Sequence, residues 1–254
     1  MKLKKIIKYI ERKYNKCLAY EGDPVGLYFA NKSKKIERVL VNLDLTMEVI
    51  EEAIAKKIDL IIVHHPFTYI GNSEVIAYNA KKKIMCIDND IAVYVLHTNY
   101  DIAYGGMNDI LAKHIGLSDI GIIEESTIEY QFMRKGKIKE QSLYQFADYL
   151  KKLFDVKSVR IIGEDKKIDS VCILGGNGSD SKSMLDAKNE NCSVYVTGDL
   201  NYESGLFAYE KDVTIIEVPH SIEKVFIDDV VNFLDELDVE LVKSEIDTDP
   251  FEIY

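Results

Sequence analysis

Two adjacent histidines end an apolar run, and their type and position make them the residues best suited to chemistry. The segment Asp59-Leu-Ile-Ile-Val-His-His-Pro66 predicts a strand that is buried on both faces, as a central parallel strand is. Proline cannot donate a ladder hydrogen bond, so the strand should end near His65. Both imidazoles therefore come at the carboxyl end of a strand, where open α/β sheets form their ligand crevice.

Imidazole and carboxylate groups follow other predicted strands in the same way. His97 ends a strand, and Asp101 comes four residues later. His220 and Glu223 follow a strand near the end of the chain. Such groups are the ligands of borderline or hard divalent metals, and they can hold two ions about 3.5–4 Å apart that activate a water for hydrolysis. The pattern predicts a metal centre.

Each residue also has a structural interpretation. A lone histidine is more often exposed or hydrogen-bonded than a ligand, and we assign His114, near a helix end, to that class. Successive strand residues point to opposite faces, so His64 and His65 could serve one centre only if the backbone turns at the following proline. Asp44 and Asp199 also follow strands, where aspartate commonly caps the next helix.

A glycine-rich turn, Gly175–Ser179, lies between a predicted strand and a predicted helix. Its backbone N–H groups could face an anion. The turn lacks the glycine spacing and the lysine of a phosphate loop, so a plain tight turn is the better interpretation.

Alternating strands and helices must position these groups. Strands are predicted over 38–44, 59–64 and 91–97, with helices over 47–57 and 74–85 between them. This β-α-β-α-β order indicates a largely parallel sheet with right-handed crossovers.

Strands and helices begin to alternate again after about residue 120, which indicates a second α/β domain. Strand pairs are expected over 122–134, an amphipathic helix over 140–154, and a last strand over 239–243. We therefore expect two α/β domains with largely parallel or mixed sheets, residues 1–120 and residues 121–254. The C-terminal segment could pack back on the first domain.

Composition and charge argue against several classes of protein. The net charge of −11 disfavours nucleic acid as the main partner, although a local basic patch is compatible with it. No apolar run approaches the roughly 20 residues of a membrane helix, and the N-terminus resembles an amphipathic helix more than a signal peptide. Four scattered cysteines indicate neither a disulfide framework nor a thiolate zinc site, and they fit a reduced cytoplasm.

Five segments together resemble the GTP cyclohydrolase I type 2 homologue family, also called the NIF-three-like proteins. The resemblance covers nearly the whole chain and matches the short form, which lacks an inserted domain. It implies two α/β domains, a two-metal centre in the cleft between them, and a toroidal homohexamer. The segments are Glu21-Gly-Asp-Pro-Val-Gly-Leu27, Val63-His-His-Pro-Phe67, His97-Thr-Asn-Tyr-Asp-Ile102 with Gly106-x-Asn108-Asp109, Thr197-Gly-Asp-Leu200, and His220.

By position, the resemblance implies that His64, His65, Asp101 and His220 are metal ligands. The cofactors would be two divalent ions, and imidazole with carboxylate suits zinc, iron, manganese or nickel.

The chain departs from the family pattern at two places. The family usually has a glutamate four positions after its late histidine, where this chain has Lys224, and Glu223 stands one residue earlier. Either the helix start shifts so that Glu223 bridges the ions, or the second metal is held weakly. The family often has a histidine after its Thr-Gly-Asp motif, where this chain has Tyr202 and Glu203. Glu203 is thus a second candidate for the displaced carboxylate.

The resemblance implies a metal-dependent hydrolase that acts on a purine nucleotide. It would open the guanine imidazole ring of GTP with loss of formate, by attack of metal-activated water at C8, with His97 as general acid or base. Two alternatives stay open: a non-enzymatic, ring-forming metal-binding or scaffold protein, and a metal-dependent phosphoesterase.

Overall fold

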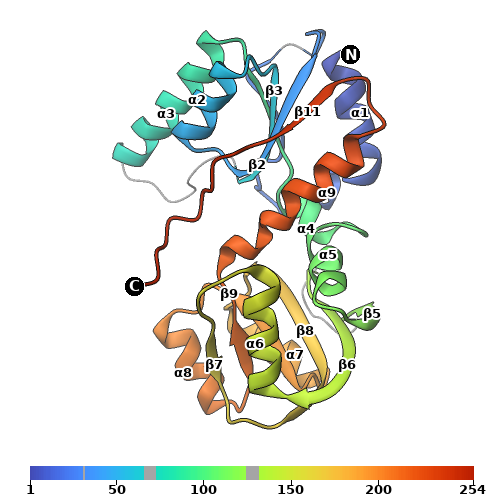
Figure 1. The fold of residues 1–254 in the computed structure, drawn as a ribbon, viewed down its shortest axis with the longest axis vertical. Coiled ribbons are helices and arrows are strands. Elements are labelled where there is room, and N and C mark those ends of the chain that lie inside the picture. Colours follow the sequence, from blue (N-terminus) through green and yellow to red (C-terminus); the bar gives the residue numbers. More distant parts are fainter. Residues whose placement is uncertain (31, 66–72, 124–131) are drawn as a thin grey trace. The chain divides into compact units, whose positions relative to one another are not determined.

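The computed structural model describes residues 1–30, 32–65, 73–123 and 132–254 of the chain. It divides into two compact units, each with its own β-sheet (Figure 1). Unit 1 comprises Met1–Ala103 and Lys224–Pro250, and unit 2 comprises Tyr104–Glu223 and Phe251–Tyr254. The expected class, α/β with two sheets, is confirmed.

The sheet of unit 1 has five strands in the order β1-β4-β3-β2-β11. Four are parallel, and β1 is antiparallel to β4. Continuous apolar runs fill its centre, as burial on both faces requires. The strands are β1 (Gly26–Tyr28), β4 (Ala92–Val95), β3 (Leu60–His65), β2 (Arg38–Asp44) and β11 (Glu240–Lys243).

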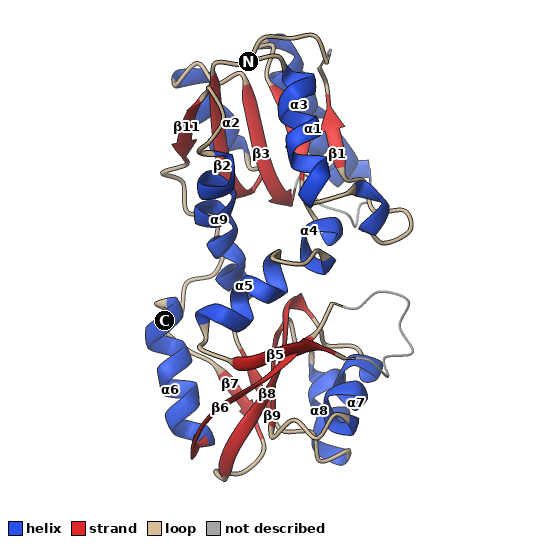
Figure 2. Cartoon of the chain, turned by 90° about the vertical axis from the view of Figure 1, so that its right-hand side faces the viewer, coloured by secondary structure: helices blue, strands red, loops and turns tan. Residues whose placement is uncertain are grey.

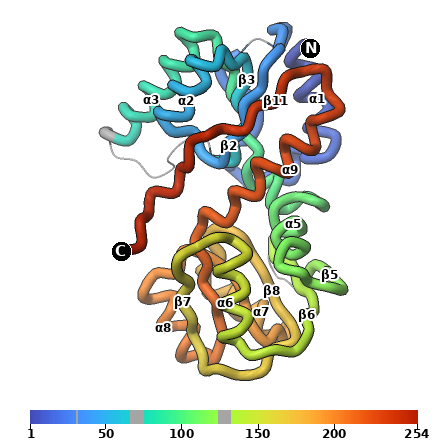
Figure 3. Tube along the Cα trace, viewed as in Figure 1, coloured from blue at the N-terminus to red at the C-terminus, as the bar shows by residue number. Residues whose placement is uncertain are grey.

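Helices cover both faces of this sheet. In Figures 1 and 3, α2 and α3 lie on one face, and α1 and α9 lie on the other. Side chains of α2 and α3 form one buried core cluster with the sheet. The helices of unit 1 are α1 (Leu3–Lys13), α2 (Met47–Ala55), α3 (Ser73–Asp88), α4 (Thr98–Ile102) and α9 (Val225–Leu234), with the short 3₁₀ helix η1 (Lys16–Leu18).

The sheet of unit 2 has six strands in the order β5-β6-β8-β9-β10-β7, and it is mixed. Strands β8, β9 and β10 run parallel, while the other pairings are antiparallel. The strands are β5 (Ser118–Ile122), β6 (Arg134–Ser142), β7 (Arg160–Ile162), β8 (Lys167–Asn177), β9 (Val194–Gly198) and β10 (Ile215–Glu217).

Helices α7 and α8 lie on one face of this second sheet and α6 lies on the other, as Figure 2 shows. Side chains of α7 and α8 pack into one core cluster with β8, β9 and β10. The helices of unit 2 are α5 (Met107–His114), α6 (Leu143–Phe154), α7 (Ser181–Asn189) and α8 (Tyr202–Glu210), with the 3₁₀ helix η2 (His220–Lys224) at its end.

The division of the chain differs from the expected boundary at residue 120. Helix α5 belongs to unit 2 because it packs on β6 and β8, and the Asn108 side chain accepts a hydrogen bond from the Gly175 N–H (2.8 Å). Residues 224–250 belong to unit 1 because β11 pairs with β2 in parallel.

The helix expected over 140–154 begins at Leu143. Ser142 and Gln145 form a capping box at its start, and residues up to Ser142 belong to β6. The strand pairs expected over 122–134 fall mostly on residues 124–131, outside the described residues.

One disulfide was not expected. Cys172 in β8 is bonded to Cys192, which precedes β9. The two residues are 20 positions apart and meet because β8 and β9 are neighbours in the sheet. No spacing motif marks such a pair in the sequence.

Within the described residues, no helix combines the length and the apolar composition that a membrane span requires.

Candidate metal centre

Three histidines of unit 1 come together at one end of its sheet. His64 and His65 end β3, and His97 follows the neighbouring strand β4. Their ring centroids are 4.4 Å (His64–His65), 5.1 Å (His64–His97) and 5.4 Å (His65–His97) apart. One nitrogen from each ring lies within 4.8 Å of the others, which is close enough for a shared metal ion. Parallel strands that end at one edge bring the three rings together.

Each of the three rings uses Nδ1 to donate a hydrogen bond. The acceptors are the Leu96 carbonyl for His64 (2.6 Å), Asp44 Oδ1 for His65 (2.9 Å) and the Asp23 carboxylate for His97 (2.9 Å). A carbonyl or carboxylate oxygen only accepts, so Nδ1 carries the proton. Nε2 is then the nitrogen that can bind a metal while this hydrogen bond is kept, as in many metal-binding histidines.

Asp101 faces His64. Its Oδ1 lies 3.4 Å from Nε2 of the buried His64 ring. In the neutral tautomer that Leu96 selects, this nitrogen and the carboxylate oxygen both carry lone pairs. Two facing acceptors repel each other unless a proton or a cation lies between them. The donor set at this point therefore fits a divalent cation.

A buried hydrogen-bond network holds α4, the helix that carries Asp101. The hydroxyls of Tyr100 and Tyr14 both donate to Asp229 Oδ2, at 2.7 and 3.2 Å. The Asn99 side chain donates to the Tyr14 carbonyl at 3.0 Å. Tyr14 and Tyr100 are fully buried, so these hydrogen bonds form where water does not compete.

Asp23 anchors His97. Burial opposes ionisation of this carboxyl, but hydrogen bonds from His97 and Thr98 outweigh it and hold the pKa of Asp23 below its usual value. The carboxylate is therefore charged at neutral pH and fixes the orientation of the His97 ring. It precedes β1, in the segment Glu21–Leu27 that resembles a family segment.

In unit 2, His220 lies between two carboxylates. Its Nδ1 is 2.7 Å from Asp199 Oδ2, and its Nε2 is 3.0 Å from Glu223 Oε2. Burial opposes the charged imidazolium, but the hydrogen bonds with Asp199 and Glu223 raise the pKa of His220 to about 11. Without a metal the ring is an imidazolium at neutral pH, and a divalent cation would replace the proton on Nε2.

The 3₁₀ helix η2 explains why Glu223, and not Lys224, lies beside His220. A 3₁₀ helix has three residues per turn, so positions i and i+3 share a face. Glu223 is 2 % exposed, whereas Lys224 is exposed to solvent. Glu203, the other candidate carboxylate, is exposed in the first turn of α8.

The glycine-rich segment, which the sequence analysis interpreted as a tight turn, instead forms the end of β8 as far as Asn177. Its glycines make room for His220 and Glu223. Gly176 has a φ of +63°, and a Cβ there would lie 2.7 Å from Glu223 Oε1 and 3.3 Å from His220 Cε1. A Cβ on Gly198 would lie 2.7 Å from the Gly176 carbonyl oxygen. Both positions require glycine because Glu223 and the neighbouring backbone approach so closely.

The sequence prediction identified the imidazoles but not their partners. Asp44 and Asp199 were interpreted as possible helix caps, yet Thr46 and Asn201 cap the helices that follow them. Instead, each aspartate binds the Nδ1 of a histidine. Their position directly after a strand was the available signal.

Asp109, which belongs to one of the resembling segments, and His114, which belongs to none, have structural roles. Asp109 forms an ion pair with Arg134 in which both side chains are nearly inaccessible to solvent. His114 packs against the Phe154 ring, with centroids 5.5 Å apart, which agrees with a structural histidine.

Comparisons with known proteins identify the family of the chain. The family profile described as Duf34/NIF3 (NGG1p interacting factor 3) matches residues 1–250. A protein of Streptococcus pneumoniae named GTP cyclohydrolase 1 type 2 homolog is 32% identical over 244 residues, covering 91% of each chain. A Lactococcus lactis protein of the same name is 32% identical over 259 residues, covering 99% of each chain.

Solved structures have the same fold. A Bacillus cereus protein related to NIF3 superposes with a TM-score of 0.86 at 27% identity, covering 98% of each chain. A Staphylococcus aureus hypothetical protein gives a TM-score of 0.88 at 26% identity, covering 100% of this chain and 99% of its own. A structure titled reduced HcgD from Methanocaldococcus jannaschii gives 0.83 at 29% identity, covering 97% and 98%.

Proposed function

Because the chain belongs to the Duf34/NIF3 family, we propose that it is a divalent-metal-dependent hydrolase that acts on a purine nucleotide. The name of its relatives, GTP cyclohydrolase 1 type 2 homolog, makes GTP the first substrate to test. The reaction would open the guanine imidazole ring and release formate.

In this proposal the metal ligands are His64, His65 and Asp101 of unit 1 with His220 and Glu223 of unit 2. One arrangement, which occurs twice, supports this proposal: a hydrogen bond at Nδ1 orients a histidine ring so that its Nε2 faces a carboxylate. It occurs in His64 with Asp101 and in His220 with Glu223. This donor set suits zinc, iron, manganese or nickel. Two such ions would activate water at neutral pH and polarise the bond under attack.

The proton transfers are assigned to His97. Its Nδ1 is held by Asp23, so its Nε2 can accept or donate a proton without rotation of the ring. His97 also belongs to the group of unit-1 histidines that could hold an ion. The His97→Gln variant separates the two roles: loss of turnover with unchanged metal content indicates acid–base catalysis.

Metal analysis and an assay for formate test the proposal. Protein purified without chelators is analysed for bound metals and then incubated with GTP. The His65→Ala variant should lose bound metal and at least about 100-fold in formate release, since the ligand set loses an imidazole. The control is His114→Ala, which removes an exposed histidine of α5 and should behave as wild type.

Two other outcomes would contradict it. Tightly bound metal without turnover of any nucleotide would favour a non-enzymatic metal-binding scaffold. Metal-dependent hydrolysis of p-nitrophenyl phosphate without formate release from GTP would favour a phosphoesterase.

We further propose that the chain self-associates into a ring-shaped homohexamer, as the family resemblance implies. Light scattering on the purified protein should then give a mass six times that of the 29.0 kDa chain. A mass equal to that of the chain would contradict the hexamer.

A further inference from the structure

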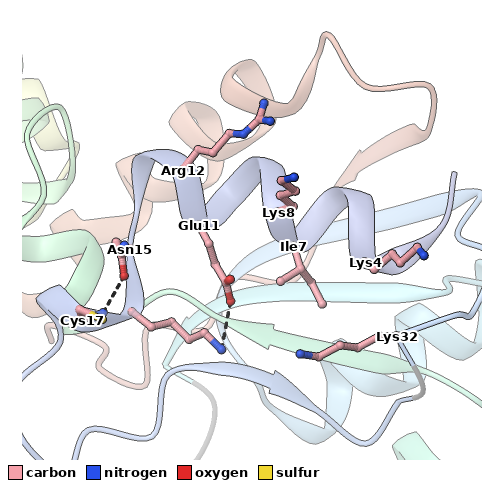
Figure 4. A pocket seen from close by; sticks show the side chains of 9 residues that line it. Lys4, Ile7, Lys8, Glu11, Arg12, Asn15, Cys17 and Lys32 are labelled. Carbon is pink, nitrogen blue, oxygen red and sulfur yellow. Dashed lines mark hydrogen bonds and ion pairs between the residues drawn. The ribbon is translucent and has the colours of Figure 1, made fainter.

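A basic groove runs along α1 in unit 1, and the proposed function does not use it. Its volume is about 560 Å³ (Figure 4). Five of its nine lining residues are cationic, and none is aromatic. The lining residues are Lys4, Ile7, Lys8, Glu11, Arg12, Asn15, Lys16, Cys17 and Lys32.

Most of this positive charge is not neutralised by the protein. Glu11 is the one acidic residue of the lining, and it pairs with Lys16 at 3.0 Å. Within the described residues, no ion pair involves the other four cations, which are Lys4, Lys8, Arg12 and Lys32. They gather on a chain whose net charge is −11, so the charge of this surface is opposite to that of the whole protein.

The helix dipole favours Arg12 in the last turn of α1, but the other cations do not help this helix to fold. Lys4, Lys8 and Arg12 are spaced four residues apart, and like charges at that spacing destabilise a helix. Lys4 also lies in the first turn, where the helix dipole disfavours cations, and this turn contains no acidic residue. The helix is held instead by its buried apolar face, formed by Leu3, Ile6, Ile7 and Ile10. A charge arrangement that opposes local stability indicates a functional site.

We propose that the α1 groove binds a small polyphosphate through its phosphate groups. The volume lies in the range of small-molecule sites, and lysine and arginine are the side chains that recognise phosphate. The groove has no aromatic side chain on which a base could stack. Nucleic acid is disfavoured because the overall negative charge of the protein would repel a long polyanion.

Calorimetry with inorganic tripolyphosphate tests this site directly. The measurement uses full-length protein in EDTA and low salt, so that metal-dependent binding does not contribute. Wild type should bind one ligand per chain, and the affinity should fall as salt rises. The Lys8→Gln/Arg12→Gln variant should bind at least about tenfold more weakly, because two charge-assisted contacts are lost.

A control on the same helix removes the same charge. Lys5 and Lys13 lie on α1 but do not line the groove. The Lys5→Gln/Lys13→Gln variant should change the affinity by less than about twofold, since the charges removed lie outside the groove and Lys13 contacts the Tyr14 and Phe233 rings instead. If both double variants lose affinity equally, the binding reflects net charge, and the site is overturned. If either helix variant has a lowered melting temperature, the Lys32→Gln variant tests the groove without a change in α1.

Titrations with GTP and with a single-stranded oligonucleotide identify which class of ligand the groove binds. If the groove recognises phosphates alone, the dissociation constant of GTP should lie within about threefold of that of tripolyphosphate. A tenfold difference in affinity would require about 1.4 kcal/mol from contacts with the nucleoside. Absence of binding at millimolar tripolyphosphate, or tighter binding of a single-stranded oligonucleotide through the same residues, would overturn the assignment. His65→Ala should keep tripolyphosphate binding, so a failure of the proposed hydrolase activity would be distinguishable from a failure of this site.

Discussion

Asp199 determines which nitrogen of His220 faces Glu223. Because Asp199 Oδ2 accepts from Nδ1 at 2.7 Å, Nε2 is directed to the Glu223 carboxylate at 3.0 Å. Asp44 and Asp23 hold His65 and His97 in the same way in unit 1. The orienting aspartates are therefore as informative about chemistry as the histidines.

Removal of Asp199 should weaken metal binding without unfolding the protein. The Asp199→Ala variant frees the His220 ring to rotate, and loss of such an outer partner typically costs about 10–100-fold in metal affinity. Titration of metal-free protein with zinc measures the change. Glu203→Gln, which removes a carboxylate from the exposed first turn of α8, should bind as wild type. Equal affinities for wild type and Asp199→Ala would contradict the orienting role.

Protonated His220 should stabilise the metal-free protein, and this contribution to the free energy of unfolding should depend on pH. The pKa of His220 is about 11 in the folded chain and near 6.5 without these partners. A raised pKa gives stabilisation that is complete below about pH 6.5 and is lost as the pH rises toward 11. Urea unfolding in EDTA should show a larger difference between wild type and His220→Gln at pH 6 than at pH 9. A difference that is independent of pH would contradict the paired imidazolium.

A methyl group at Gly176 should disturb Glu223. The Gly176→Ala variant places a Cβ 2.7 Å from Glu223 Oε1 and also strains a backbone with a φ of +63°. Gly116→Ala is the matched control, because its φ is +81° and the nearest atom, the Tyr149 hydroxyl, is 3.8 Å away. Backbone strain should cost both variants about 1–2 kcal/mol of unfolding free energy. Only Gly176→Ala should also lose bound metal, as metal analysis would show.

The buried ion pair of Asp109 and Arg134 should support the fold of unit 2 and not the chemistry. The side chains are 6% and 4% exposed, so Arg134→Met leaves a buried carboxylate without its cation. Such changes cost about 3–5 kcal/mol, whereas replacing both charges by apolar groups is often far less costly. Urea unfolding should therefore give a larger free energy of unfolding for Asp109→Leu/Arg134→Met than for Arg134→Met. Preferential loss of metal in these variants, without loss of stability, would argue against a structural role.

Hydrophobic patterning accounts for the part of the fold that could be predicted. The apolar runs of β2 and β3 specify buried parallel strands, and Thr46 marks the start of α2. Strand β6 was missed because Arg134–Ser142 is mostly polar, and its strand conformation depends on antiparallel pairing with β8. Pairing partners that are distant in sequence are not visible in local composition.

The candidate site was predictable in its residue types more than in its geometry. The strand-end histidines and Asp101 could be identified because the ends of neighbouring parallel strands share one sheet edge. The choice between Glu223 and Lys224 depended on whether His220 begins a 3₁₀ or an α-helical turn, which the sequence leaves open. The pairing of Asp23 with His97 spans 74 residues and arises only in the folded chain.

The first sheet combines strands that precede unit 2 in the sequence with one that follows it, because β11 covers the outer edge of β2. A chain emerging from the ribosome therefore completes all of residues 104–223 before that edge finds its neighbour. Until then β2 presents unsatisfied N–H and carbonyl groups, and an open edge of this kind invites aggregation. Asp229, to which the hydroxyls of Tyr14 and Tyr100 donate, is also translated late. Asn99 and Thr98 can bond early to Tyr14 and Asp23, but Tyr100 beside Asp101 gains its acceptor only after residues 104–223 have been synthesised.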